Sequence, residues 1–157
     1  MSTAIHSQAT ATPARTVAGY RVACDVAQRW LALLGVILCA LQIGFAALGF
    51  WGAQLNGGSE KATRAAFAPH GMNGEVLQYL AVLLLILGLL AWSGWKTWVI
   101  PLVLAVMLFT VQGILVGLGF GVGPWFGFLH AIGGTVITAG FVWLTIDRWR
   151  HPLRRTA

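Results

Sequence analysis

Four apolar stretches, each about 20 residues long, constrain most strongly what this chain can fold into. A helix rises about 1.5 Å per residue, so about 20 apolar residues cross a hydrocarbon layer about 30 Å thick. Charged residues make up only 9% of the 157 residues, whereas a soluble domain carries about 25%. We therefore expect an all-α membrane protein, an antiparallel bundle of four transmembrane helices at roughly 28–50, 70–93, 97–120 and 125–148.

The segments between these stretches are short, so the sequence predicts one transmembrane domain over residues 16–149. Residues 1–15 are small and polar without apolar periodicity, which is typical of a disordered tail. Residues 150–157 form a basic tail. The first apolar stretch is too long for the central region of a cleavable signal peptide, and we interpret it as a retained helix.

Basic residues are divided unequally between the two ends of the predicted bundle. Only Lys61 and Arg64 lie on the side of the first loop. The side of the termini carries Arg15, Arg21, Arg29, Lys96, Arg148, Arg150, Arg154 and Arg155. Lys-rich and Arg-rich segments stay in the cytoplasm, so we expect both termini there and a location in the cell membrane. This topology and the attraction to anionic lipids explain the net charge of +6 without a nucleic-acid partner.

A polar-and-glycine pattern occurs twice within the apolar stretches. It consists of a Gln with a Gly seven residues later in one helix, then a His with a Gly four residues later in the next. The two copies comprise Gln42, Gly49, His70 and Gly74, and then Gln112, Gly119, His130 and Gly134. The recurrence suggests two helix-pair repeats related by an axis along the membrane normal.

The two histidines suggest a cofactor, because an unpaired polar group in hydrocarbon costs several kcal/mol. Imidazoles on alternate helices of a bundle suit axial ligation of one b-type haem for electron transfer. In this hypothesis the glycines make room for the macrocycle, a glutamine holds an imidazole N–H, and the two basic residues of the loop meet the propionates. The candidate cofactor site comprises His70 and His130 as metal ligands, with Gln42, Gln112, Gly74, Gly134, Lys61 and Arg64.

Other functions stay open. His70 can lie in the outer headgroup region, and Gln42 and Gln112 can bind each other or backbone carbonyls as interhelical ties. The protein would then be a non-enzymatic structural or assembly subunit, either a homo-oligomer or docked on a larger membrane complex through residues 113–123. Transport of a small solute or binding of another metal is a further alternative. A nucleophile with a base, a cysteine cluster and a phosphate loop are all missing from the sequence, which argues against an enzyme.

Helix starts give an argument against haem. If helices begin at Pro69 and Pro124, His130 lies about five residues deeper in its helix than His70, or about 7 Å. A tilted helix or an inward-folded loop would be needed to bring the two rings to one level. We also expect Glu75 in the first turn of the second helix, where a carboxylate favours the helix dipole.

The motifs together resemble a family of small bacterial four-helix membrane proteins classed as a domain of unknown function. The resemblance covers about residues 30–147 and rests on Leu41-Gln42, Leu48-Gly49, Pro69-His70, Gly74, Val111-Gln112, Leu118-Gly119 and Leu129-His130. It implies a four-helix fold and an envelope location, and it gives no activity. The chain departs from the family pattern at Gly71, where a basic residue is expected, and at Ala131, where a proline is expected.

Overall fold

The computed structural model describes residues 17–154, and the tail expected over residues 1–15 lies outside this range. All secondary structure in the described range is helical: α1 Gly19–Leu55, α2 Glu60–Ala66, α3 Ala68–Ala91, α4 Lys96–Val106, the π-helical turn η1 Met107–Val111, α5 Gln112–Gly121 and α6 Pro124–Arg150. Four helical rods are long and apolar enough to cross a membrane, namely α1, α3, the continuous α4–η1–α5 and α6. The predicted all-α multi-pass membrane protein is confirmed.

The first helix is longer than the sequence predicts. It begins at Gly19, nine residues before the expected start, and continues to Leu55. Its 37 residues correspond to about 55 Å at 1.5 Å per residue, well beyond the hydrocarbon thickness. The extension at the N-terminal end buries Asp25 and Gln28 completely, so packing against other helices determines where this helix begins.

The segment between α1 and α3 is mostly helical. A turn with left-handed Gly57 and Gly58 (φ +77° and +65°) reverses the chain, and the Ser59 hydroxyl then caps α2. Only Phe67 separates α2 from α3, and its N–H still donates to the carbonyl of the fourth preceding residue at 3.0 Å. The second rod therefore forms a nearly continuous helical column that begins at Glu60.

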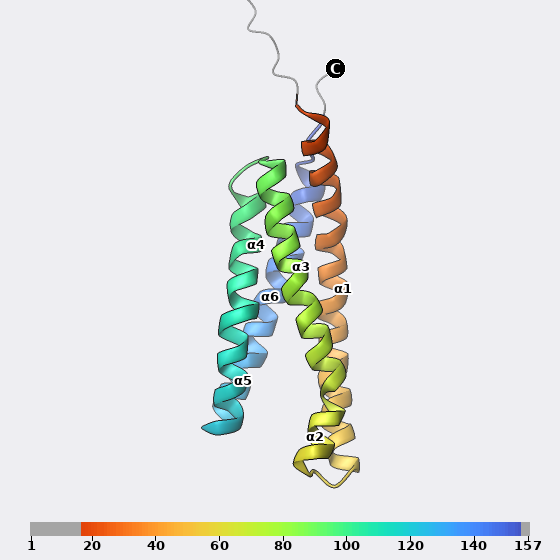
Figure 1. Ribbon diagram of the computed structural model, residues 1–157, viewed down its shortest axis with the longest axis vertical. Coiled ribbons are helices and arrows are strands. Elements are labelled where there is room, and N and C mark those ends of the chain that lie inside the picture. The colour runs from red at the N-terminus through yellow and green to blue at the C-terminus, as the bar shows by residue number, and fades with distance from the viewer. Residues whose placement is uncertain (1–16, 155–157) are drawn as a thin grey trace, which may run out of the picture.

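The two ends of the molecule differ in packing (Figure 1). At the end with both chain termini, here called the termini end, α1 and α4 each pack against both α3 and α6. Toward the opposite end, here called the loop end, the molecule divides into a leg of α1, α2 and α3 and a leg of α5 and α6. Among the described elements, α5 contacts only α6 and its own rod. The bundle is therefore closed at one end and splayed at the other.

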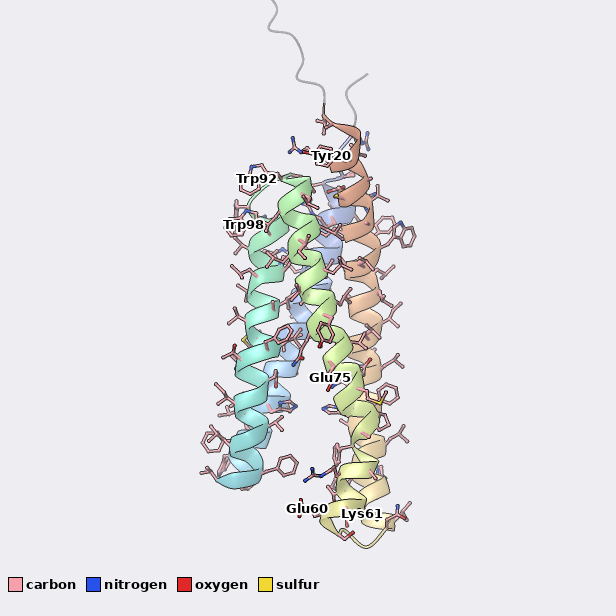
Figure 2. The ribbon with its side chains drawn as sticks, viewed as in Figure 1. Tyr20, Glu60, Lys61, Glu75, Trp92 and Trp98 are labelled. Carbon is pink, nitrogen blue, oxygen red and sulfur yellow. The ribbon has the colours of Figure 1, made fainter. Side chains whose placement is uncertain are left out.

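Aromatic and charged side chains mark the two ends. Trp92 and Trp98 stack at the termini end, and Glu60 and Lys61 lie at the loop end (Figure 2). The apolar core between them includes Leu84, Phe141 and Leu144, none of which is exposed. Tryptophan favours membrane interfaces, so the stacked pair indicates the level at which the termini end leaves the hydrocarbon.

A π-helical turn interrupts the third rod, where the sequence predicts a regular helix. The π-turn η1 has one more residue per turn than an α-helix and so leaves backbone carbonyls without their usual partners. Gln78 of α3 donates from Nε2 to the carbonyl of Leu108 in this turn at 3.2 Å. The turn ends directly before Gln112, and it therefore sets the direction in which that side chain projects.

Candidate functional site

In the first leg, Gln42 of α1 and His70 of α3 bind each other's backbone. His70 Nδ1 donates to the Gln42 carbonyl at 3.2 Å, and Gln42 Nε2 donates to the His70 carbonyl at 3.0 Å. Because a carbonyl only accepts, Nδ1 carries the proton and Nε2 keeps its lone pair. Gln42 Nε2 donates to that ring nitrogen at 3.3 Å. The backbone of α1 thus fixes the tautomer in which His70 Nε2 is an acceptor, and a metal bound there would replace the Gln42 amide.

Asn73 completes this arrangement, although the sequence analysis did not select it. Its Nδ2 donates to Gln42 Oε1 at 2.5 Å and to the Leu38 carbonyl at 3.0 Å. The amide of Gln42 therefore has a partner on both its oxygen and its nitrogen. Asn73 lies three residues after His70, on the same face of α3, which was a signal available from the sequence.

The second leg has the same kind of contact with fewer hydrogen bonds. Gln112 Nε2 donates to the His130 carbonyl at 3.2 Å. Gln112 is buried, and its Oε1 has no hydrogen-bond partner in the described part of the chain. The same holds for His130 Nδ1, a second buried polar atom left unpaired. Such atoms are rare in folded proteins and indicate a site whose bonding is incomplete.

Two glycines lie against the two glutamine amides. A Cβ added to Gly74 would lie 3.4 Å from Gln42 Nε2, so this glycine borders the amide. In the second leg the amide sits against Gly133, where a Cβ would lie 2.5 Å from Gln112 Nε2. No described atom lies within 4 Å of a Cβ added to Gly134. Gly133 therefore does in α6 what Gly74 does in α3.

In each leg, the glycine seven residues after the glutamine lies against the residue three positions before the histidine. A Cβ on Gly49 would lie 2.5 Å from the ring of Phe67, three residues before His70. A Cβ on Gly119 would lie 3.3 Å from the backbone nitrogen of Gly127, three residues before His130. Both contacts require a close approach of the two helices in a leg, and both glycines provide it by lacking a side chain.

The two histidines face each other across the legs. Their ring centroids are 6.2 Å apart, with 61° between the ring planes. Both side chains are half-buried. The depth difference expected from the helix starts does not separate them, because the helical column that carries His70 begins at Glu60, ten residues before it.

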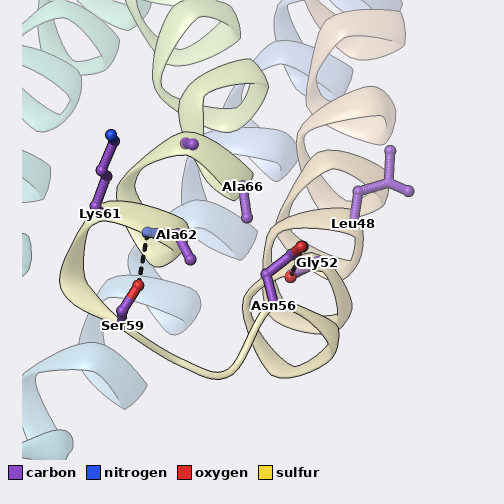
Figure 3. Close-up of a pocket in the computed structure, with 8 residues that line it drawn as sticks. Leu48, Gly52, Asn56, Ser59, Lys61, Ala62 and Ala66 are labelled. Carbon is purple, nitrogen blue, oxygen red and sulfur yellow. Dashed lines mark hydrogen bonds between the residues drawn. The ribbon is translucent and has the colours of Figure 1, made fainter.

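Lys61 and Arg64 have other surroundings. Arg64 pairs with Glu60 at 2.8 Å, and both side chains are more than four-fifths exposed. Lys61 lines a hollow between α2 and the end of α1, together with Leu48, Gly52 and Asn56 (Figure 3). Neither the pair nor the hollow includes a histidine. Glu75 also differs from its expectation, because α3 begins at Ala68 and Glu75 lies about two turns into the helix, exposed.

A group of buried charges at the termini end was largely missed by the sequence analysis. We call Asp25, Arg29, Asp147 and Arg148 the acid–arginine cluster. Arg148 binds Asp25 at 3.1 Å and Asp147 at 2.5 Å, and it also donates to the Ser93 hydroxyl at 2.7 Å. Arg29 binds Asp25 at 3.0 Å. The cluster joins α1, α6 and the turn between α3 and α4, with Asp25 wholly buried.

The chemistry of the histidine site follows from its small ligand set. We use this name for Gln42, His70, Gln112 and His130. No group of three or more metal-binding side chains occurs in residues 17–154. Structural zinc needs four protein ligands and catalytic zinc needs three, whereas haem iron takes four ligands from its macrocycle and needs only axial ones. Two imidazoles therefore suit haem better than a bare metal ion.

No family model, curated protein or solved structure matches the chain. The function of the histidine site is therefore inferred from its own geometry.

Proposed function

We propose that this protein binds one b-type haem between His70 and His130 and transfers electrons within the cell membrane. The observation that carries the proposal is the 6.2 Å separation of the two ring centroids. With metal–nitrogen bonds of about 2 Å, two imidazoles on opposite sides of one ion have centroids about 6 Å apart. The 61° between the ring planes is compatible with this, because each ring can rotate about its metal–nitrogen bond.

The hydrogen bonds of the two histidines support the same role. His70 is held by its Nδ1–H on the Gln42 carbonyl, the outer contact that metal-binding histidines usually make. His130 Nδ1 and Gln112 Oε1 are buried without partners among the described residues. A bound haem would supply one-electron redox chemistry, and the residues named here would orient its axial imidazoles.

The splayed legs support a large, flat ligand. α5 has no contact with α1 or α3 among the described elements, so the two histidines lie where the legs diverge. A macrocycle needs such a space beside its axial ligands, and four-helix bundles commonly bind cofactors between facing helices. Gly134, which has open space around it, would leave room for the macrocycle next to His130.

The corresponding contacts in the two legs support an internal duplication. In each leg a glutamine amide donates to the histidine carbonyl, and the glycine seven residues later lies against the third residue before the histidine.

With both termini in the cytoplasm, as the basic residues favour, the haem would lie in the outer half of the membrane.

An absorption spectrum of the purified protein tests this proposal. We expect a Soret band and, after reduction, a sharp alpha band. His130→Ala should abolish both bands, and His70→Ala should abolish them or produce a high-spin spectrum. His151→Ala is the matched control, because this exposed histidine lies at the other end of the molecule, and its spectrum should equal that of the wild type. A protein that stays colourless after expression with excess haem and after reconstitution would contradict the proposal.

The alternative is a structural role in which the polar residues only tie helices together. Four hydrogen bonds that the side chains of Gln42, His70 and Asn73 donate favour it, because they join α1 to α3 without any ligand. In that case the protein would be colourless and would purify in mild detergent with a stoichiometric membrane partner.

A further inference from the structure

A groove runs between α4 and α6 on the outside of the bundle, near the termini end. Its volume is about 580 Å³, and apolar side chains line nearly all of it. The α4 side and the adjoining π-turn provide Trp95, Val103 and Met107, and the α6 side provides Val136, Ala139 and Trp143. The groove is distinct from the histidine site, because the two sites share no residue.

A cationic side chain, that of Lys96, lies at the mouth of this groove. Lys96 Nζ is 6.0 Å from the ring centroids of both Trp95 and Trp143, which line the groove. Its side chain is 41% exposed and forms a long ion pair of 3.9 Å with Asp147, a carboxylate that Arg148 binds more closely, at 2.5 Å. Lysine at a helix end extends its ammonium toward the lipid headgroups. The ammonium is thus available to an anion that approaches from the membrane surface.

The length of the groove matches one leaflet. From Trp95 to Met107 the rod advances twelve residues, which is about 18 Å at 1.5 Å per residue. One leaflet contributes about half of the hydrocarbon thickness of about 30 Å. The groove therefore begins at the level of the headgroups, where tryptophan is enriched, and ends near the middle of the membrane.

We propose that this groove binds one anionic phospholipid, with an acyl chain along α4 and α6 and the phosphate at Lys96. Charge complementarity selects lipid over a helix from a second copy of the chain. A packed helix would gain no hydrophobic stabilisation from leaving lipid, and it would cover the exposed ammonium without providing an anion. The proposal does not depend on haem.

Native mass spectrometry in mild detergent tests the proposal with phosphatidylglycerol and phosphatidylcholine as probes. We expect the first phosphatidylglycerol to bind about fivefold more tightly than the first phosphatidylcholine, since a lysine near the membrane surface contributes about 1 kcal/mol. Lys96→Gln should remove this preference, and Lys96→Arg should keep it. Lys61→Gln, at the loop end, is the matched control and should leave both affinities unchanged.

A second variant tests the groove itself. Ala139→Trp would fill the groove and should weaken binding of both lipids, and circular dichroism checks that the helices stay folded. The proposal is overturned if Lys96→Gln retains the preference of the wild type, or if Ala139→Trp binds both lipids as the wild type does. A dimer that forms without lipid and is broken by Ala139→Trp would also overturn it, because a second copy would then occupy the groove.

Discussion

The acid–arginine cluster and the histidine site use polar groups in opposite ways. At the termini end, Arg148 binds two buried carboxylates and a hydroxyl, and Asp25 also binds Arg29. At the histidine site, the polar groups are uncharged amides and imidazoles. Gln112 Oε1 and His130 Nδ1 are buried without a partner among the described residues, as are Gln28 Oε1 and Arg29 Nε at the termini end. The acid–arginine cluster therefore joins its helices by ion pairs, whereas the histidine site joins its helices by hydrogen bonds between uncharged groups.

Removing the arginine of the cluster should give the largest loss of stability. Arg148→Ala leaves Asp25 and Asp147 buried without their shared partner. Breaking a buried ion pair in this way costs about 3–5 kcal/mol. Denaturant unfolding in detergent micelles measures the change in free energy, and Arg150→Ala, an exposed arginine in the last turn of α6, should leave it nearly unchanged. Equal effects of the two substitutions would mean that the cluster does not lock the bundle.

Two glycine substitutions compare the packing of the two ends directly. At the termini end, the backbone carbonyl of Thr97 occupies the place where a Cβ on Gly88 would lie, so Gly88→Ala should cost about 1–3 kcal/mol through overpacking. At the loop end, a Cβ on Gly134 meets no described atom within 4 Å. Gly134→Ala should instead stabilise the helix by up to about 1 kcal/mol. The same unfolding assay measures the change in free energy for both variants. A similar loss for both would mean that the two ends do not differ in packing.

Gln42→Leu should lower stability less than Arg148→Ala, and it should also change the midpoint potential of the haem. The substitution removes the donor to the His70 carbonyl and the acceptor for Asn73, at an expected cost of about 1–2 kcal/mol. The haem should stay bound with a shifted midpoint potential, because the His70 Nδ1–H still has the Gln42 backbone carbonyl. Redox titration measures the shift, and Gln54→Leu, an exposed glutamine near the end of α1, is the control. An unchanged midpoint potential would mean that the Gln42 side chain does not influence the cofactor.

The two regions also differ in how far the sequence predicted them. Gln42, His70, Gln112 and His130 were selected because polar residues in apolar helices are costly, and the structure brings them together at the loop end. The acid–arginine cluster was missed because Asp25 precedes the apolar stretch, and only tertiary packing brings it to Arg148, 123 residues away.

Two finer details were not predicted from the sequence. The pattern singled out Gly134, four residues after His130, whereas the glycine that borders the Gln112 amide is Gly133. The expected start of the second helix at Pro69, where proline favours the first turn, agrees with α3, which begins at Ala68. What the sequence analysis did not predict is the helical segment directly before it. The chain is already helical from Glu60 to Ala66, and Phe67 continues the hydrogen bonding into α3.

The π-turn Met107–Val111 changes the rotation of the third rod about its own axis. Successive residues of an α-helix are about 100° apart around its axis. Deleting one residue from this turn, so that the rod becomes an ordinary α-helix, would rotate everything from Gln112 onward by about that angle relative to α4. The amide would then turn away from His130 while α4 kept its packing against α3 and α6. One inserted residue thus allows the same rod to present one face to the closed bundle and another to the histidine site.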